Sequence, residues 1–164
     1  MLKIRNALPP DADFISALIT SLAHLFYASP NGSGAESFKD AITPQALVLY
    51  LVRLDINYLA GEEDGTLCGV VALRGHRHLQ HLFVVPAFQR RGIGRELWLA
   101  ARNAAIAAGY AGDFTVNSSM NAVLVYQRFG FKSVGGPQQN NGLIFQPMEL
   151  TQATDETLAV PSRT

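Results

Sequence analysis

Residues 89–95, Gln-Arg-Arg-Gly-Ile-Gly-Arg, stand between an apolar run at residues 79–85 and an Ala- and Leu-rich segment at residues 92–108. The apolar run predicts a buried strand, and the proline-free segment after it predicts a helix. The first turn of a helix carries four N–H groups without partners and a partial positive charge. Because Gly92 and Gly94 have no side chain, phosphate groups can approach this backbone closely. The segment therefore predicts a site for a ligand that carries a diphosphate.

The arginines of this segment have two explanations. In the ligand-binding interpretation, Arg90, Arg91 and Arg95 pair with phosphate oxygens. In the simpler one, the glycines form a turn that caps a helix, and the arginines lie on a solvated face. Two nucleotide-binding motifs are excluded. A dinucleotide fingerprint needs a third glycine where the chain has Leu97, and a P-loop needs a Gly-Lys-Ser/Thr run that the sequence lacks.

Composition excludes several classes of protein. With 164 residues, 48% hydrophobic and 16% charged, the chain is long enough and apolar enough to bury a core. Thirteen Lys and Arg balance thirteen Asp and Glu, so the bulk positive charge of a nucleic-acid-binding protein is missing. The single Cys68 excludes an internal disulfide and fits a reducing cytosol. No apolar run reaches the length of a membrane span, and residues 1–5 do not resemble a signal peptide. We expect a cytoplasmic protein without a membrane or nucleic-acid partner.

The order of strand and helix patterns predicts an α/β fold with a mixed sheet and helices on its faces. We expect strands at residues 2–5, 58–62, 67–73, 79–85, 113–117, 131–134 and 143–150. We expect helices at residues 14–25, 43–54, 92–108 and 121–129, and flexible loops at residues 31–34 and 135–142. Residues 1–150 are predicted to form one domain, followed by a loosely ordered polar tail at residues 151–164.

Two blocks of sequence together resemble the GNAT superfamily of N-acetyltransferases. Residues 82–94, Leu-Phe-Val-Val-Pro followed by Gln-Arg-Arg-Gly-Ile-Gly, look like the family's acetyl-CoA motif, Gln/Arg-x-x-Gly-x-Gly/Ala after a strand. Residues 121–131 are similar to its Asn…Tyr-x-x-x-Gly-Phe segment. The resemblance covers residues 2–150. It implies a GNAT-like domain with a mostly antiparallel central sheet, splayed fourth and fifth strands and four flanking helices.

The resemblance implies that acetyl-CoA is the cosubstrate and that its pantetheine lies between the splayed strands. The amide of Leu82 would donate to the thioester carbonyl, where negative charge develops, and Asn121 would bond the pantetheine arm. Residues 82–85 also fit an ordinary core strand, and both roles are compatible because the family uses backbone atoms there. The cofactor residues that the resemblance implies are Leu82, Phe83, Val84, Gln89, Arg90, Arg91, Gly92, Ile93, Gly94, Arg95, Asn121 and Tyr126.

Two side chains are candidates for proton transfer. Tyr126 matches the family's general acid, which returns a proton to the leaving thiolate; a phenol pKa of about 10 against about 8.5 for a thiol makes this mildly uphill. His78 lies where several family members place a base. Strand alternation groups His78 with Leu82 and Val84 on one face and His81 on the other. His78, His81 and water stay open as the base. Because His81 faces away from the other histidines, no metal site is expected.

The acceptor is the part of the site that the sequence specifies least. By the resemblance, we expect it near residues 25–29, Tyr50 and the loop at residues 135–142, with Asp40 or Glu36 facing a cationic amine. A small-molecule amine and a protein amine are both compatible with the motifs. The apolar residues 143–145 are a possible homodimer contact. A CoA-binding module without catalysis is the alternative to an enzyme.

Overall fold

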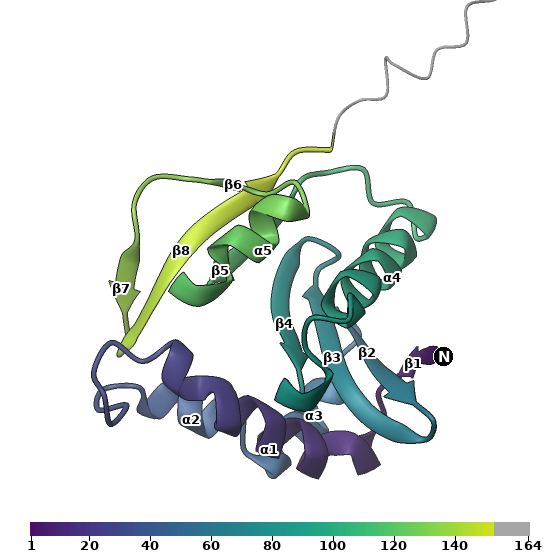
Figure 1. The fold of residues 1–164 in the computed structure, drawn as a ribbon, viewed down its shortest axis with the longest axis horizontal. Coiled ribbons are helices and arrows are strands. Elements are labelled where there is room, and N and C mark those ends of the chain that lie inside the picture. Colours follow the sequence, from purple (N-terminus) through teal and green to yellow (C-terminus); the bar gives the residue numbers. More distant parts are fainter. Residues whose placement is uncertain (153–164) are drawn as a thin grey trace, which may run out of the picture.

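The computed structural model of the chain describes residues 1–152. Its central element is an eight-stranded sheet of order β1-β2-β3-β4-β5-β8-β6, with β7 paired to β8 (Figure 1). Every neighbouring pair is antiparallel except β4–β5. The strands are β1 (Leu2–Asn6), β2 (Ile56–Glu63), β3 (Thr66–Arg74), β4 (His78–Val84), β5 (Phe114–Ser118), β6 (Lys132–Ser133), β7 (Gln138–Asn140) and β8 (Leu143–Leu150). The mixed, mostly antiparallel sheet is the one predicted.

The described residues hold five α-helices, where the sequence predicts four. They are α1 (Ala12–Leu22), α2 (Glu36–Ala41), α3 (Pro44–Leu51), α4 (Ile93–Ala107) and α5 (Val123–Arg128). The additional helix, α2, buries none of its six residues, so no apolar period marks it in the sequence. The short strand β7 lies in the segment predicted as a loop. All of its residues are exposed, so no pattern of apolar residues marks it in the sequence either. The predicted tail lies, from residue 153 on, outside the described residues.

The sheet divides at its one parallel pair. Strands β4 and β5 pair only through His78 with Thr115 and Leu79 with Val116. Beyond these two positions the strands diverge, so that β1–β4 and β5–β8 form the two sides of a V (Figure 1). The predicted splay of the fourth and fifth strands is therefore confirmed.

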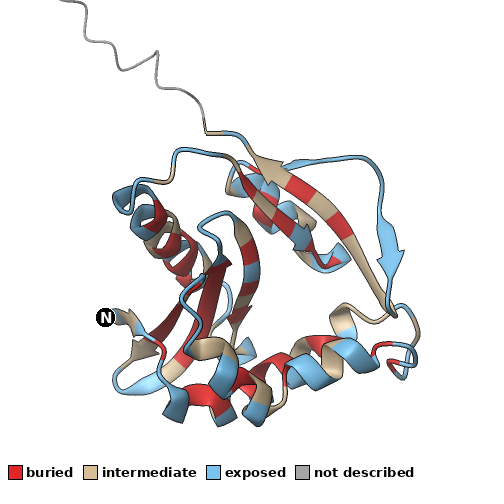
Figure 2. Ribbon diagram, turned by 180° about the vertical axis from the view of Figure 1, so that it is seen from behind, coloured by how far each residue is buried: buried red, intermediate tan, exposed pale blue. Residues whose placement is uncertain are grey.

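Each face of the sheet has its own apolar core (Figure 2). Helix α4 covers one face, where Trp98 meets Phe114 edge-on with ring centroids 5.2 Å apart. Helices α1 and α3 cover the other face and bury Ile15, Ile19 and Leu47 completely. The interleaved buried and exposed residues of α1 and α4 fit this three-layer packing, in which each helix buries one side against the sheet.

A β-bulge in β4 determines which side chains face each core. His81 pairs with Ala72 and Leu79 pairs with Leu73, so Gln80 is an extra residue in the ladder. As a result Leu79 packs in the core under α4, as Leu82 does, whereas His81 packs under α1 and α3 beside that core's residues. The predicted alternation is therefore wrong on the N-terminal side of Gln80. The bulge reverses the faces, so His78 does not share the face of Leu82.

The two halves of the sheet also touch through the segment that follows α1. The 3-10 helix Ala23–Leu25 continues α1, and the next residue, Phe26, accepts a hydrogen bond from the amide of Ile144 in β8 (2.8 Å). Ala28 donates to the carbonyl of Gly142 (2.8 Å). A Cβ on Gly142 would lie 2.4 Å from a backbone carbon of Gly34, so only glycine fits there. These contacts close one side of the V and position Phe26.

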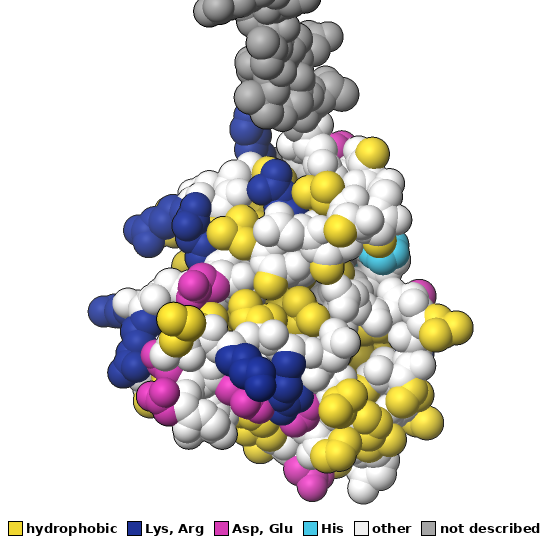
Figure 3. Space-filling model, turned by 90° about the vertical axis from the view of Figure 1, so that its right-hand side faces the viewer, with side chains coloured by type: hydrophobic (Ala, Val, Ile, Leu, Met, Phe, Trp, Pro, Cys, Tyr) yellow, Lys and Arg dark blue, Asp and Glu magenta, His cyan; other side chains and the backbone are white. Residues whose placement is uncertain are grey.

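Charged side chains on the surface pair locally. Arg5 contacts both Asp11 and Glu62 at 2.8 Å. On the face shown in Figure 3, basic side chains are interspersed with acidic ones. None of the helices within residues 1–152 combines the length and apolarity that crossing a bilayer requires.

Candidate active site

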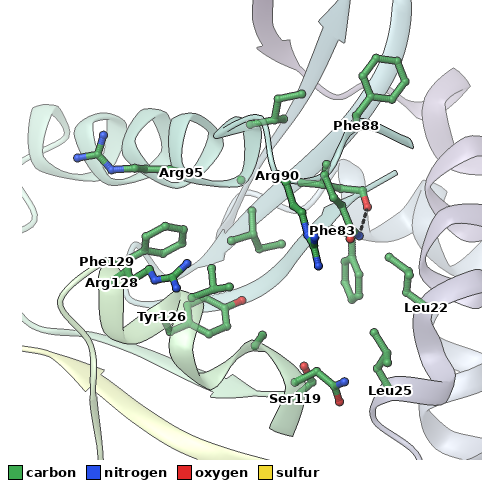
Figure 4. A pocket seen from close by; sticks show the side chains of 18 of the residues that line it. Leu22, Leu25, Phe83, Phe88, Arg90, Arg95, Ser119, Tyr126, Arg128 and Phe129 are labelled. Atoms are coloured by element: carbon green, nitrogen blue, oxygen red, sulfur yellow. Dashed lines mark hydrogen bonds between the residues drawn. The ribbon is translucent and has the colours of Figure 1, made fainter. Parts of the chain in front are cut away.

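A cavity of about 880 Å³ lies where β4 and β5 diverge (Figure 4). Its walls come from β4, from the loop and first turn of α4, from the end of α1 and from α5. Two of the predicted site residues, His78 and Arg91, do not line it. Those that do are Leu82, Phe83, Val84, Gln89, Arg90, Gly92, Ile93, Gly94, Arg95, Asn121 and Tyr126.

The loop before α4 has the geometry of an anion site. The Gln89 side chain donates to the carbonyl of Val84 (3.0 Å), which ties the loop back to β4 (dashed line in Figure 4). Arg90 (φ 64°) and Gly92 (φ 77°) both adopt left-handed conformations, and Gly92 is the N-cap of α4. The amides of the first turn therefore face outward without helix partners. At Gly94, a Cβ would meet nothing nearer than a Val84 methyl at 3.7 Å, so the protein itself does not fill this space.

Positive charge at the cavity comes from three arginines. Arg90, Arg95 and Arg128 line it, and Arg128 extends from α5 on the opposite side of the V. Arg91 instead lies over the ring of Phe88 (5.3 Å) and 3.6 Å from Glu63. Arg128 is not among the predicted site residues, although it is part of the motif block at residues 121–131. Membership of that block was the signal that could have identified it.

Tyr126 is buried in α5, and its hydroxyl points into the cavity (Figure 4). Its ring packs edge-on against Phe129 and Phe131, with centroids 5.9 and 5.7 Å away. Burial raises the pKa of this phenol well above its usual value. At neutral pH the group is therefore protonated, which is the state that a proton donor requires, and the raised pKa also makes it a weaker acid than a free phenol.

Neither His78, which is partly buried, nor His81, which is buried, lines the cavity. His78 Nδ1 is 2.8 Å from the Thr115 hydroxyl, and His81 Nδ1 is 2.9 Å from the Tyr58 hydroxyl. Burial lowers the pKa of each to about 4, so both are neutral at pH 7. The role of His78 as a base stays a prediction. Among residues 1–152, no three His, Cys, Asp or Glu side chains gather closely enough to hold a metal ion.

The opposite end of the cavity is apolar. Of the predicted acceptor segment at residues 25–29, Leu25 and Phe26 line the cavity, together with Leu22 and Phe83. Tyr50 and the loop at residues 135–142 do not. Leu22 was not among the predicted acceptor residues, although it lies one helical turn before Phe26. Glu36 and Asp40 are exposed and do not line the cavity, and Glu36 instead accepts a hydrogen bond from the amide of Gly34 (3.3 Å). The expectation that they face the acceptor is therefore wrong.

Comparison with known proteins identifies this arrangement. A family model described as an acetyltransferase (GNAT) domain matches residues 26–152. No curated protein matches in sequence. The PaiA N-acetyltransferase of Thermoplasma acidophilum, solved with coenzyme A, superposes with a TM-score of 0.74 at 20% identity over 93% of this chain and 99% of its own. A GCN5-related N-acetyltransferase from Rhodopseudomonas palustris superposes with a TM-score of 0.75 at 24% identity, over 92% of this chain and 95% of its own. An aminoglycoside 6′-N-acetyltransferase solved with coenzyme A superposes with a TM-score of 0.68 at 14% identity, over 92% of this chain and 96% of its own.

Proposed function

The chain belongs to the GNAT acetyltransferase family, and from this premise we propose that it transfers the acetyl group of acetyl-CoA to a primary amine. The observation that carries the proposal is the convergence on one cavity of the glycine loop that begins α4 and the phenol of Tyr126. The first supplies amides for a diphosphate, and the second supplies a proton to a leaving thiolate. Two of the three similar structures described above contain coenzyme A.

The residues present fit coenzyme A. The first-turn amides of α4, with Arg90 and Arg95 beside them, suit its pyrophosphate, and the space in front of Gly94 admits the phosphate groups. The part of β4 that has no partner in β5 leaves main-chain groups of Leu82 and Val84 for the pantetheine arm. Asn121, on the other side of the gap, offers an amide side chain to the same arm.

Acetyl-CoA supplies a thioester, and in the reaction the amine nitrogen bonds to its carbonyl carbon while the carbon–sulfur bond breaks. The backbone amide of Leu82 stabilises the negative charge on the carbonyl oxygen. The hydroxyl of Tyr126 donates the proton that the sulfur receives. A neutral amine gives up one proton as the amide forms, and we propose that His78 receives it through water, because His78 does not line the cavity. His78 is neutral at pH 7 and so can accept a proton, although its lowered pKa of about 4 makes it a weak base.

Two measurements on the purified chain test the proposal. Calorimetry with coenzyme A and acetyl-CoA measures binding, and a thiol-release assay over a panel of primary amines measures transfer. We expect binding of both and release of one thiol for each amide formed. Binding without transfer on any amine would favour a non-catalytic CoA-binding module, and no binding by folded protein would refute the cofactor site. We further expect the protein to act in the cytosol, since its single cysteine, Cys68, is buried and unpaired among the described residues.

A further inference from the structure

We infer that the acceptor is a small primary amine with one positive charge and an apolar body, and that polyamines and aminoglycosides are poor substrates. The inference rests on the proposed acetyl transfer and adds the class of acceptor. It follows from the end of the cavity that lies away from the glycine loop, where the side chains are of a different kind from those around the N-terminus of α4.

Hydrocarbon side chains form much of this end, and Ser119 and Asn121 add polar groups to the lining of the cavity. Leu22 and Leu25 come from the end of α1 and the 3-10 helix after it, and they lie across from Phe83 of β4 (Figure 4). The rings of Phe26 and Phe83 have centroids 6.1 Å apart. The hydrogen bond from Ile144 to the carbonyl of Phe26 fixes this wall to the other half of the sheet. An apolar body placed here gains free energy in proportion to the apolar area that it removes from water.

The charges at the cavity disfavour a second ammonium group. Among the described residues that line it, the charged side chains are Arg90, Arg95 and Arg128, and no Asp or Glu is present. A second cation in the apolar end would lose its hydration without gaining a carboxylate partner. It would also be repelled by any arginine that the cofactor phosphates leave unneutralised. Polyamines and aminoglycosides carry such additional cations.

The same walls favour the reactive form of a single amine. An ammonium group has no lone pair, so the amine must lose its proton before it attacks. Apolar surroundings disfavour the charged form and lower the pKa of an amine that binds there. The apolar end therefore selects against an additional charge and assists the deprotonation of the one nitrogen that reacts.

A matched pair of substrates tests the inference. 1-Pentylamine and 1,4-diaminobutane have the same length and differ only in a terminal methyl or ammonium group, and 2-phenylethylamine adds an aryl body. We measure kcat/KM by thiol release and, independently of turnover, the Kd of each amine for the protein saturated with coenzyme A. We expect 1-pentylamine to be favoured over the diamine by about tenfold or more in both measurements, equivalent to about 1.4 kcal/mol. A comparable value for 2-phenylethylamine indicates that an aryl body also fits, whereas a much lower one restricts the acceptor to alkyl amines.

A charge placed in the apolar end gives the second test. Leu25→Glu adds a carboxylate to the wall and should reduce the preference for 1-pentylamine by about tenfold. Leu25→Gln, of similar size without charge, should reduce it much less. The control Leu49→Glu adds the same charge on α3, 69% exposed and outside the cavity, and should leave the preference unchanged.

These outcomes separate the inference from the proposed function. A wild-type preference for the diamine, or an equal change in Leu25→Glu and Leu49→Glu, would overturn the inference, as would absence of binding by all three amines. In each of these cases, intact coenzyme A binding would leave the cofactor site standing. Should coenzyme A itself fail to bind, the proposed function fails first, and the inference fails with it.

Discussion

At the α4 end of the cavity, the groups that face a ligand are backbone amides and glycines from one continuous segment, residues 89–95. At the α1 end they are side chains that come from α1, from the segment after it and from β4. In the proposed function, the first end binds the cofactor through atoms that every residue possesses, so its sequence must supply backbone conformation and space. In the inference above, the second end discriminates between acceptors through side-chain shape and charge, which separate segments provide. A cofactor site is therefore visible as a local motif, and an acceptor site is not.

The largest effect that we expect is on kcat, from a change at Tyr126 in the cavity. Tyr126→Phe removes the hydroxyl that faces the cavity and leaves the ring packed against Phe129 and Phe131. Loss of a general acid should lower kcat about 100-fold, while the Kd for coenzyme A stays within about twofold. Single-turnover thiol release and calorimetry measure the two quantities. An undiminished kcat would show that the phenol does not donate the proton.

The stability of the protein at acid pH tests the packing of His81 against Phe83, which lines the apolar end of the cavity. The pKa of His81 is lowered from 6.5 to about 4 by burial, so between these pH values the unfolded chain binds a proton that the folded chain does not. The free energy of unfolding should be highest above pH 6.5, and this group alone should lower it by about 3 kcal/mol as the pH drops towards 4. Urea unfolding followed by Trp98 fluorescence measures it.

The matched variant for this prediction is His81→Gln. Its side-chain oxygen can still accept the hydrogen bond from Tyr58, but it does not titrate. We expect a clearly smaller loss of stability between pH 6.5 and 4. His78, whose pKa is lowered in the same direction, accounts for part of the remaining loss. An unchanged pH dependence would mean that His81 is not the group responsible.

The α4 end is tested most directly at Gly94. Gly94→Ala places a methyl group in space that the protein leaves open, and alanine is the better helix former. We expect the Kd for coenzyme A to rise about tenfold, whereas the thermal midpoint stays equal or increases. Opposite movement of affinity and stability would be the signature of a backbone-lined ligand site. Unchanged affinity would indicate that no phosphate group approaches this residue.

Removing the candidate base should have a comparable effect that depends on pH. His78→Ala should lower kcat/KM about tenfold near neutral pH and remove the limb of the pH–rate profile that reports an enzyme base. His78→Gln, which can still hydrogen-bond Thr115, separates a structural role from a basic one. If the profile of His78→Ala keeps its shape and follows the pKa of the amine substrate, water removes the proton.

The smallest effect separates two neighbouring arginines. Arg90 lines the cavity, whereas Arg91 lies over Phe88. Because Arg90 is exposed and therefore screened, Arg90→Gln should raise the Kd for coenzyme A about fivefold. Arg91→Gln should change it less than about twofold and reduce stability by under 1 kcal/mol, since its ion pair with Glu63 is a loose surface pair. Calorimetry on both variants decides. Equal changes in the Kd of the two variants would mean that coenzyme A binding depends on the total charge near the loop and not on the position of each arginine.

Much of the fold followed from patterns confined to short segments. The Ala- and Leu-rich, proline-free run of α4, the proline at the start of α3 and the alternation of residues 2–5 are local properties, because helix and strand geometry repeat within a few residues. The glycine loop belongs to the same class, since a left-handed Gly92 and an open Gly94 are requirements on single residues.

Contacts between distant segments decided the remainder. The bulge at Gln80, which turns His78 away from the face of Leu82, depends on how β3 pairs with β4. The position of Phe26 depends on a hydrogen bond from Ile144, 118 residues later in the chain. The membership of Leu22 and Arg128 in one cavity depends on the V between β4 and β5. Local preference cannot specify such placements, because the energy that selects them comes from packing and pairing between segments that meet only in the folded chain.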